Sequence, residues 1–298
     1  MALTPVTLRP GIGDAPPKAT LFYGWDARKS LRELPRVSVH CVCTSPPFWG
    51  LRDYDRELQI GTEETPEEYI QKLVEVFQEV RQVLRDDGVL WLNLGDCYSA
   101  GGMGGHASSK SFNGHRGRRG LPLVRKPPPG MKPKNLMGIP WRVALALQED
   151  GWYLRGDVIW HKPNSMPESV EDRPSKSHEY LFLLSKTDRY FFRKNPRLRS
   201  VWSISTVPYA GAHFAAWPPE IVQRAVEMGC PEGGVVLDPF SGSATTGAVA
   251  VRMGRDYVGL DLNADYLTLA ESRIRGLGLS EDAPLWDYSV LDMFSSKE

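Results

Sequence analysis

The chain has 298 residues, and 41% of them are hydrophobic, which is enough for one large core with a modest insertion. Lys and Arg together number 36, as do Asp and Glu, so net charge gives no general indication of a nucleic-acid partner. Residues 1–18 lack the apolar segment of a signal peptide, and no later run is apolar enough to span a bilayer. These features favour a cytoplasmic protein with no membrane partner.

The first predicted elements are a strand over residues 20–23 and a helix over residues 27–34, joined by an acidic turn at Asp26. Asp26 stands at a position from which a carboxylate can cap the helix. A second, buried strand is predicted over residues 37–43, because this run is short, apolar and rich in β-branched side chains.

The four cysteines, Cys41, Cys43, Cys97 and Cys230, include no C-x-x-C pair. Their spacing predicts neither a disulfide framework nor a zinc site, and no metal is expected. Cys41 and Cys43 are two positions apart in a predicted strand, so we expect both side chains on one face of the sheet.

Residues 44–50 read Thr-Ser-Pro-Pro-Phe-Trp-Gly, and the paired prolines prevent the preceding strand from continuing. Ligands of open α/β sheets bind at the carboxyl ends of strands, which makes Ser45, Pro46, Pro47 and Phe48 candidate catalytic residues. A plain proline turn that buries both aromatic side chains is the alternative. The pattern Ser-Pro-Pro-Phe after an apolar strand resembles the catalytic loop of amino-methylating DNA methyltransferases, which modify the exocyclic nitrogen of cytosine or adenine.

The resemblance implies that this loop makes an exocyclic amine reactive. Such an amine is a poor nucleophile because its lone pair is delocalised into the base, and acceptors aimed at its N–H groups localise that pair. The Ser45 hydroxyl and the Pro46 carbonyl are the acceptors that we expect, since proline fixes the local backbone. Phe48 would stack on a base swung out of the duplex, a contact worth about 1–3 kcal/mol. Methyl transfer would be direct, with no covalent intermediate.

The next predicted elements are helices over residues 66–84 and 139–147 and strands over residues 89–94, 157–160 and 181–184. Asp96 follows the first of these strands and suits either a base pocket or a purely structural role. Residues 160–164, Trp-His-Lys-Pro-Asn, resemble a stretch that related enzymes carry.

Two segments have an excess of basic residues. Residues 99–134 are rich in glycine and proline and contain eight Lys and Arg but no acidic residue, which is typical of a loop that contacts phosphates or simply of a solvated loop. Residues 190–199 alternate aromatic and basic side chains, as in a nucleic-acid surface or an edge hairpin. The candidate DNA contacts, in insertions predicted at about residues 99–135 and 186–205, are Arg116, Arg118, Arg119, Lys126, Arg193 and Lys194.

A second motif lies late in the chain. A short strand is predicted over residues 234–237, a turn of small residues over 238–247 and a helix over 248–253. The string Asp-Pro-Phe-Ser-Gly-Ser-Ala-Thr-Thr resembles the Asp-Pro-Phe-x-Gly-Ser-Gly-Thr-Thr motif that binds S-adenosylmethionine in the same methyltransferases, with Ala244 in place of the last glycine. The resemblance assigns to the cofactor Asp238, Phe240, Ser241, Gly242, Ser243 and Thr245.

Further cofactor contacts are predicted on both sides of this motif. Asp261 follows a strand predicted over residues 257–260, where an acidic side chain can accept hydrogen bonds from both ribose hydroxyls or cap the next helix. The resemblance places Asp26 near the cofactor adenine. It also assigns to the methionine end of the cofactor the residues His213, Phe214, Trp217 and Pro218.

The catalytic loop precedes the cofactor motif, an order that resembles the permuted β group of these enzymes. We therefore predict one α/β domain over residues 1–298, with a Rossmann-like S-adenosylmethionine-dependent methyltransferase fold and a mostly parallel sheet. The expected partners are double-stranded DNA and, unless the enzyme acts alone, a cognate restriction endonuclease, in a bacterium, an archaeon or a phage. Ser45 favours N4 of cytosine as the target. The alternatives are N6 of adenine, an RNA or protein substrate, and an inactive DNA-binding protein of the same fold.

Overall fold

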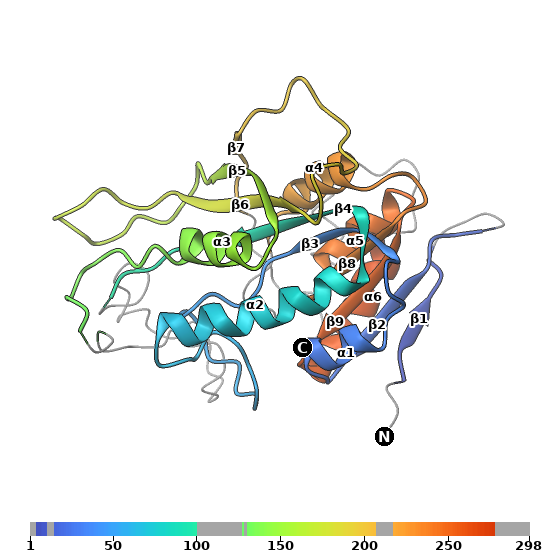
Figure 1. Cartoon of the computed structure of the whole chain (residues 1–298), viewed down its shortest axis with the longest axis horizontal. Coiled ribbons are helices and arrows are strands. Elements are labelled where there is room, and N and C mark those ends of the chain that lie inside the picture. Colours follow the sequence, from blue (N-terminus) through green and yellow to red (C-terminus); the bar gives the residue numbers. More distant parts are fainter. Residues whose placement is uncertain (1–3, 11–14, 100–126, 128–129, 207–216, 278–298) are drawn as a thin grey trace.

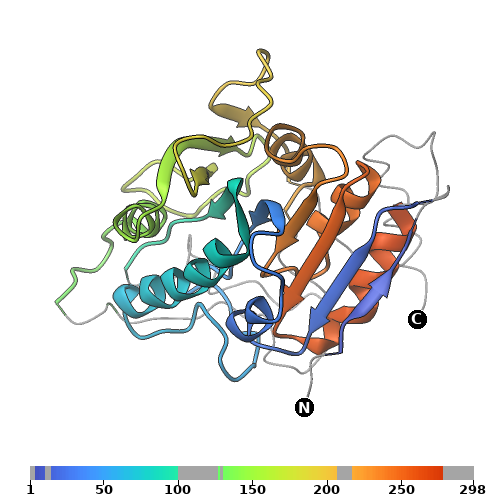
Figure 2. The ribbon, with the colours of Figure 1, turned by 45° about the vertical axis from the view of Figure 1, so that its right-hand side comes forward.

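The computed structural model describes residues 4–10, 15–99, 127, 130–206 and 217–277, and these form one nine-stranded sheet with helices on both faces (Figures 1 and 2). The strands are β1 (Val6–Leu8), β2 (Ala19–Tyr23), β3 (Val39–Thr44), β4 (Leu84–Leu94), β5 (Tyr153–His161), β6 (His178–Ser185), β7 (Val201–Ser203), β8 (Val235–Asp238) and β9 (Asp256–Asp261). The helices are α1 (Ala27–Arg32), α2 (Pro66–Val83), α3 (Ile139–Glu149), α4 (Pro219–Gly229), α5 (Thr245–Arg252), the short 3-10 helix η1 (Ala264–Tyr266) and α6 (Leu267–Leu277).

The strands lie in the order β1-β2-β9-β8-β3-β4-β6-β5-β7. Strands β2, β9, β8, β3 and β4 are parallel to one another, and β7 is parallel to β5. Strands β1 and β6 run antiparallel to their neighbours. The predicted α/β fold with a mostly parallel sheet is therefore confirmed. Strand β3, from the first part of the chain, pairs directly with β8, from the last part, so the two motifs are brought together.

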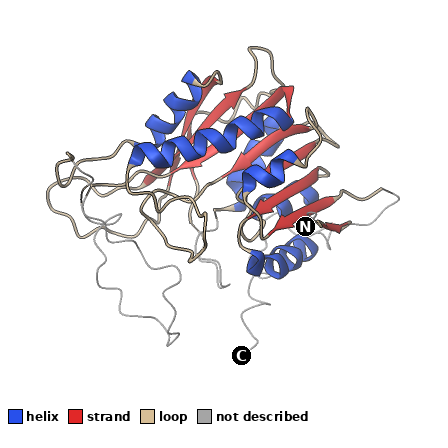
Figure 3. Ribbon diagram, turned by 60° about the horizontal axis from the view of Figure 1, so that its bottom comes forward, coloured by secondary structure: helices blue, strands red, loops and turns tan. Residues whose placement is uncertain are grey.

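The sheet separates two hydrophobic cores. Helices α1, α2 and α3 pack on one face, and α4, α5 and α6 pack on the other (Figure 3). Cys41 and Cys43 contribute to one core and Val42 contributes to the other, which confirms the predicted alternation. No helix within the described ranges is long and apolar enough to cross a membrane.

Strand β4 begins earlier than the sequence predicted. It starts at Leu84, immediately after α2, and includes Asp86, Asp87 and Gly88, which precede the strand predicted over residues 89–94. A Cβ atom at Gly88 would lie 2.6 Å from Leu84 Cδ1, so a larger residue here would require the Leu84 side chain to move. The register against β3 is irregular at the same level, which is how the strand accommodates the polar residues.

The sequence did not predict β1, β7 or α4. Strands β1 and β7 have only three residues each and lie at the two edges of the sheet, and they are too short for a recognisable pattern. Helix α4 begins at Pro219 after the N-cap residue Pro218, because proline suits the first turn of a helix. Residues 190–199 contain no strand, so the edge hairpin considered for them is wrong.

Several strand ends meet along one edge of the sheet. The parallel strands β9, β8, β3 and β4 all end there, and β5 ends beside the start of β6, where His161 pairs with His178. The loops that follow these strand ends therefore converge on one region, and the candidate site lies there.

Candidate active site

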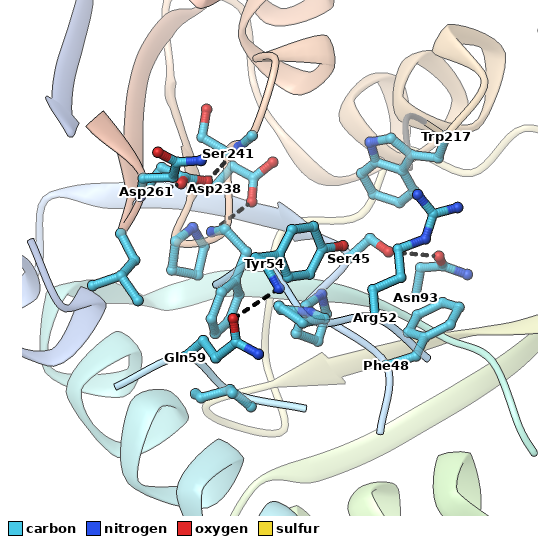
Figure 4. A pocket seen from close by; sticks show the side chains of 18 of the residues that line it. Ser45, Phe48, Arg52, Tyr54, Gln59, Asn93, Trp217, Asp238, Ser241 and Asp261 are labelled. Atoms are coloured by element: carbon cyan, nitrogen blue, oxygen red, sulfur yellow. Dashed lines mark hydrogen bonds between the residues drawn. The ribbon is translucent and has the colours of Figure 1, made fainter. Parts of the chain in front are cut away.

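A pocket with a volume of about 450 Å³ lies at this edge (Figure 4). Because the sheet order runs from β9 to β8, β3 and β4, the side chains at the strand ends form a row. Asp261 and Asp238 lie at one end of the row, Ser45 lies in the middle, and Asn93 lies at the other end. The pocket thus joins the Asp-Pro-Phe turn to the Ser-Pro-Pro loop.

Asp261 holds the turn after β8 against the turn after β9. Its Oδ2 accepts a hydrogen bond from Gly242 N at 2.7 Å, and its Oδ1 accepts one from Asn263 N at 2.7 Å. Burial raises the pKa of Asp261 to about 6 despite these bonds. A carboxylate has about four acceptor sites, so two bonds leave capacity for ligand hydroxyls. Asn263, and not Asp261, is the N-cap residue of η1, so the capping alternative is wrong.

Asp238 links the two motifs. Thr44 Oγ1, at the end of β3, donates to Asp238 Oδ1 at 2.6 Å, and Thr246 Oγ1 donates to Oδ2 at 2.7 Å. Phe240 N donates to Oδ1 at 3.1 Å. Burial raises the pKa of Asp238 to about 6, against the opposing effect of these three donors. The role of Thr44 was not predicted, because a threonine at a strand end carries no distinctive signal.

Ser241 is held by two tyrosine hydroxyls. Its Oγ lies 2.7 Å from Tyr23 Oη and 2.7 Å from Tyr257 Oη, and Tyr23 Oη also donates to Gly242 O at 2.9 Å. A Cβ atom at Gly259 would lie 2.8 Å from the Ser241 hydroxyl. The hydrogen bonds of Ser241 with the two tyrosines therefore fix the shape of the turn. At Gly259 a larger residue would clash with the Ser241 hydroxyl.

Ala244 adopts a left-handed conformation, with φ of +58° and ψ of 41°, at the N-cap of α5. Its side chain is fully buried. Glycine is the residue that adopts this conformation without cost, which explains why the related motif has glycine here. The chain keeps the turn in spite of the added methyl group.

The side chains of the Ser-Pro-Pro loop and of the two aromatic residues after it have different surroundings. Ser45 Oγ donates to Asn93 Oδ1 at 2.9 Å (Figure 4). Pro47 O accepts a hydrogen bond from Tyr69 Oη at 2.9 Å. Phe48 lines the pocket, whereas Trp49 is buried and donates from Nε1 to Glu63 O. The alternative of two core aromatics therefore holds for Trp49 only.

The Phe48 ring lies directly on Gly95. A Cβ atom at Gly95 would be 2.5 Å from Phe48 Cε2, so this glycine leaves the room that the ring occupies. Asp96, the next residue, accepts hydrogen bonds from Gly138 N and Ile139 N at the start of α3. It does not line the pocket, so its role is structural.

Several other predicted residues line the pocket. Asp26 does so and also caps α1, accepting a hydrogen bond from Arg28 N at 2.9 Å, so the capping interpretation is confirmed and its place near the cofactor stays a prediction. Trp217 lines the pocket, while Pro218 lies behind it as the N-cap of α4. His213 and Phe214 lie outside the described residues. The predicted site residues that line the pocket are Asp26, Ser45, Pro46, Pro47, Phe48, Trp217, Asp238, Phe240, Ser241, Gly242, Ser243, Thr245 and Asp261.

Sequence reasoning missed the loop between β3 and α2. Tyr54 and Gln59 line the pocket, and Tyr54 N donates to Gln59 Oε1 at 2.9 Å (Figure 4). Arg56 donates to Asn263 Oδ1 at 2.6 Å, which ties this loop to the turn after β9. Sequence reasoning also missed Asn93, Lys162 and Glu179. The signal available in the sequence was that these residues lie at or near predicted strand ends. Which side chains they contact is visible only in the structure.

Of the predicted DNA contacts, Arg193 and Lys194 fall within the described residues. Phe191 N donates to Asp87 O near the start of β4, and Arg193 N donates to Met228 O at the end of α4. Arg193 also forms an ion pair with Glu232. Arg193 and its neighbour Lys194 therefore lie at the sheet edge opposite the pocket. Arg116, Arg118, Arg119 and Lys126 lie outside the described residues.

The residues present fit S-adenosylmethionine. A backbone-lined turn, a buried carboxylate at the end of the next strand and an adjoining apolar wall offer contacts for its amino acid, ribose and adenine parts. Together, fold and site define a Rossmann-like S-adenosylmethionine-dependent methyltransferase with permuted motif order.

Comparisons with known proteins identify the family. Residues 39–272 match the N6/N4 family of enzymes described as DNA methylase, and the chain belongs to this family of DNA amino-methyltransferases. The chain is 49% identical to the Type II methyltransferase M.XycI of Xanthomonas campestris pv. cyanopsidis, over 87% of this chain and 88% of the relative. The protein is thus a DNA methyltransferase of the Type II class, with S-adenosylmethionine as its cofactor.

Solved structures show the same fold. The cytosine-N4-specific PvuII DNA methyltransferase matches with a TM-score of 0.64 at 20% identity, covering 96% of this chain and 94% of the other. The Thermus thermophilus protein TTHA0409, complexed with S-adenosyl-L-methionine, matches with a TM-score of 0.61 at 26% identity, covering 87% of this chain and 94% of the other.

Proposed function

We propose that this enzyme transfers a methyl group from S-adenosylmethionine to the exocyclic N4 of cytosine in duplex DNA, directly and on a flipped-out base. The observation that carries the choice of cytosine is Ser45. Related enzymes that act on N4 usually have serine before the two prolines, whereas those that act on N6 of adenine usually have aspartate or asparagine. Ser45 lines the pocket, and its hydroxyl has a fixed partner in Asn93.

The cofactor is proposed to lie at the β8–β9 end of the pocket, where it would supply an electrophilic methyl group. Asp261 accepts hydrogen bonds from the ribose hydroxyls, and Asp26 lies toward the adenine. The turn that begins at Asp238 presents its backbone to the amino acid part, and Trp217 forms an apolar wall. Asp238 accepts hydrogen bonds from Thr44, Thr246 and Phe240 N, so its role is to hold this turn beside the Ser-Pro-Pro loop.

The target base is proposed to lie at the β3–β4 end. The Ser45 Oγ and Pro46 O atoms accept hydrogen bonds from the exocyclic amine, which favours a lone pair localised on nitrogen. Phe48, resting on Gly95, offers its ring for stacking on the base. Arg116, Arg118, Arg119 and Lys126 are retained as proposed phosphate contacts from the sequence alone.

Product analysis tests this proposal. DNA lacking modification is incubated with the recombinant enzyme and cofactor, digested to nucleosides and analysed by mass spectrometry. N4-methylcytosine is the expected product, and Ser45→Ala is the matched control for a contaminating activity. N6-methyladenine as the only modified nucleoside would overturn the assignment. Modification sequencing of the same DNA gives the recognition site.

We also propose that this methylation protects DNA from an endonuclease that cuts at the same site. The Type II methyltransferase name of the Xanthomonas relative supports this role. Once the site is known, DNA methylated by the enzyme is challenged with an endonuclease of that specificity. Methylated DNA should resist cutting, and cleavage at the unmethylated rate would contradict the proposal.

A further inference from the structure

A chain of hydrogen bonds leads away from Ser45 through the polar wall of the pocket. Asn93 Oδ1 accepts from Ser45 Oγ at 2.9 Å, and Asn93 Nδ2 donates to Glu179 Oε2 at 3.1 Å. Lys162 Nζ donates to the other Glu179 oxygen, Oε1. The four residues come from the loop after β3, from β4, from the start of β6 and from the loop after β5, and all of them line the pocket.

The Lys162 end of this chain of hydrogen bonds is held in place. The Lys162 ammonium lies 4.3 Å from the centre of the Trp160 ring, and Trp160 Nε1 donates to Ile204 O at 2.8 Å. Lys162 N donates to Ser177 O at 2.7 Å. Glu179 is 8% exposed, so its carboxylate depends on Lys162 and Asn93 as partners.

The chemistry of the partners fixes the orientation of the Asn93 amide. Its Nδ2 faces two oxygens, Glu179 Oε2 and Tyr180 O at 3.1 Å, and a carboxylate and a carbonyl can only accept. A flipped amide would place its oxygen against both of them. Asn93 Oδ1 must therefore face Ser45, and the Ser45 proton must point at Asn93.

This orientation decides what Ser45 can offer a base. A serine hydroxyl has one proton and two lone pairs, and the proton is committed to Asn93. The lone pairs are left to accept from an exocyclic N–H group. A free hydroxyl proton would instead be able to bond to the amine lone pair, which is the pair that must attack the methyl group. The fixed orientation prevents that competing bond.

We propose that Glu179, oriented by Lys162, and Asn93 are positioning residues that make Ser45 an obligate hydrogen-bond acceptor for the exocyclic amino group of the target base. The inference rests on the proposed function, because it takes Ser45 to contact that amine. It adds three residues from neighbouring strand ends to the site. None of the three needs to touch the reacting atoms.

The substitution Glu179→Gln separates this role from simple packing. Glutamine has the same shape but only one oxygen, and Lys162 will attract that oxygen, so the glutamine Nε2 will face Asn93. The Asn93 amide is then driven to flip and to donate to Ser45. We expect a loss of about tenfold in kcat, the cost of one charged hydrogen bond, with unchanged cofactor affinity.

Two comparisons test whether the loss passes through Ser45. In the Ser45→Ala background, Glu179→Gln should change kcat by less than about twofold, because the residue through which it acts is gone. Adding Lys162→Met to Glu179→Gln should restore part of the activity, since the glutamine can then turn its oxygen to Asn93. His161→Gln, on the same strand end but outside the chain of bonds, is the matched control and should leave kcat unchanged.

The readouts are single-turnover methylation of a duplex with the mapped site, calorimetry with S-adenosylmethionine and thermal unfolding of each variant. Equal losses from Glu179→Gln with and without Ser45 would overturn the inference, as would a further loss when Lys162→Met is added. The proposed function is tested separately, by whether the wild-type enzyme produces N4-methylcytosine. That result does not depend on how the variants behave.

Discussion

Ser45 is one of a small group of side chains whose roles can be separated by measurement. It lies between the two halves of the pocket, and its hydroxyl is bonded to Asn93 on the side away from the cofactor turn. We expect Ser45→Ala to lower kcat by about 100-fold, the scale for loss of one aligned hydrogen-bonding group, while cofactor affinity is unchanged. Single-turnover methylation and calorimetry measure the two effects. Parallel loss of cofactor binding would contradict this division, and Ser38→Ala, just before the opposite end of β3, serves as the control.

The raised pKa of Asp261 predicts that the affinity for S-adenosylmethionine depends on pH. Burial raises its pKa to about 6, so the carboxyl is protonated below that pH and loses acceptor capacity for the ribose. The affinity for S-adenosylmethionine should therefore fall as pH decreases from about 7.5 to about 5. Asp261→Asn should bind about tenfold more weakly at the upper end of this range and show a smaller fall with pH. Calorimetry across the range measures both.

Two controls make the pH experiment specific. Asp238 also has a pKa raised to about 6 by burial, so the slope that remains in Asp261→Asn reports on Asp238. Asp256 lies at the other end of β9, where it accepts a hydrogen bond from Lys18 N. Asp256→Asn should keep the wild-type profile. An identical pH profile in Asp261→Asn and wild type would show that Asp261 is not the titrating group.

At the scale of elements, β3 and β8 are joined by side chains as well as by backbone pairing. Thr44 donates to the buried Asp238 carboxylate across the two strand ends. Thr44→Val keeps the shape but removes this donor, which should lower the free energy of unfolding by about 2 kcal/mol. Urea denaturation measures the loss. Thr20→Val makes the same change on β2, and a loss of the same size there would show that the effect is not due to Asp238.

Most elements could be predicted because local signals agreed with the fold. Thr65 and Pro66 mark the start of α2, where the structure has a capping box between Thr65 and Glu68. Paired prolines end β3, and small residues mark the turn before α5. Strand β4 was predicted to start at residue 89 because Asp86, Asp87 and Gly88 are typical of turns, whereas the strand extends back to Leu84 with an irregular register against β3. Helix α4 was missed because Pro218 and Pro219 suggested a ligand contact more strongly than a helix start.

The candidate site was predictable where residues follow one another in the chain. The Ser-Pro-Pro loop and the Asp-Pro-Phe turn are continuous motifs, and pairing of β3 with β8 brings them together. Asn93, Lys162 and Glu179 belong to three separate segments that meet only through the order β4-β6-β5. No local pattern encodes that meeting, so only the structure reveals how they connect to Ser45.

At the scale of the whole molecule, the pocket and the basic residues Arg193 and Lys194 lie at opposite edges of the sheet. The pocket lies at the carboxyl edge of β3 and β4, whereas Arg193 and Lys194 lie near the start of β4. The rise of a strand is about 3.3 Å per residue, so the length of β4 separates these regions by roughly 20 Å or more. A duplex that delivers its base to the pocket therefore has no need to contact Arg193 or Lys194.

This geometry predicts which cations carry the salt dependence of DNA binding. The double variant Arg193→Ala/Lys194→Ala should bind a duplex with affinity within about twofold of wild type and with the same slope against salt concentration. Arg116→Ala/Arg118→Ala/Arg119→Ala, in the segment chosen from sequence, should weaken binding and reduce that slope by about 0.9 for each phosphate that the variant no longer neutralises. Fluorescence anisotropy at several salt concentrations measures both. A reduced slope in the first variant would mean that DNA also reaches the opposite edge, and an unchanged slope in the second would remove these arginines from the proposed interface.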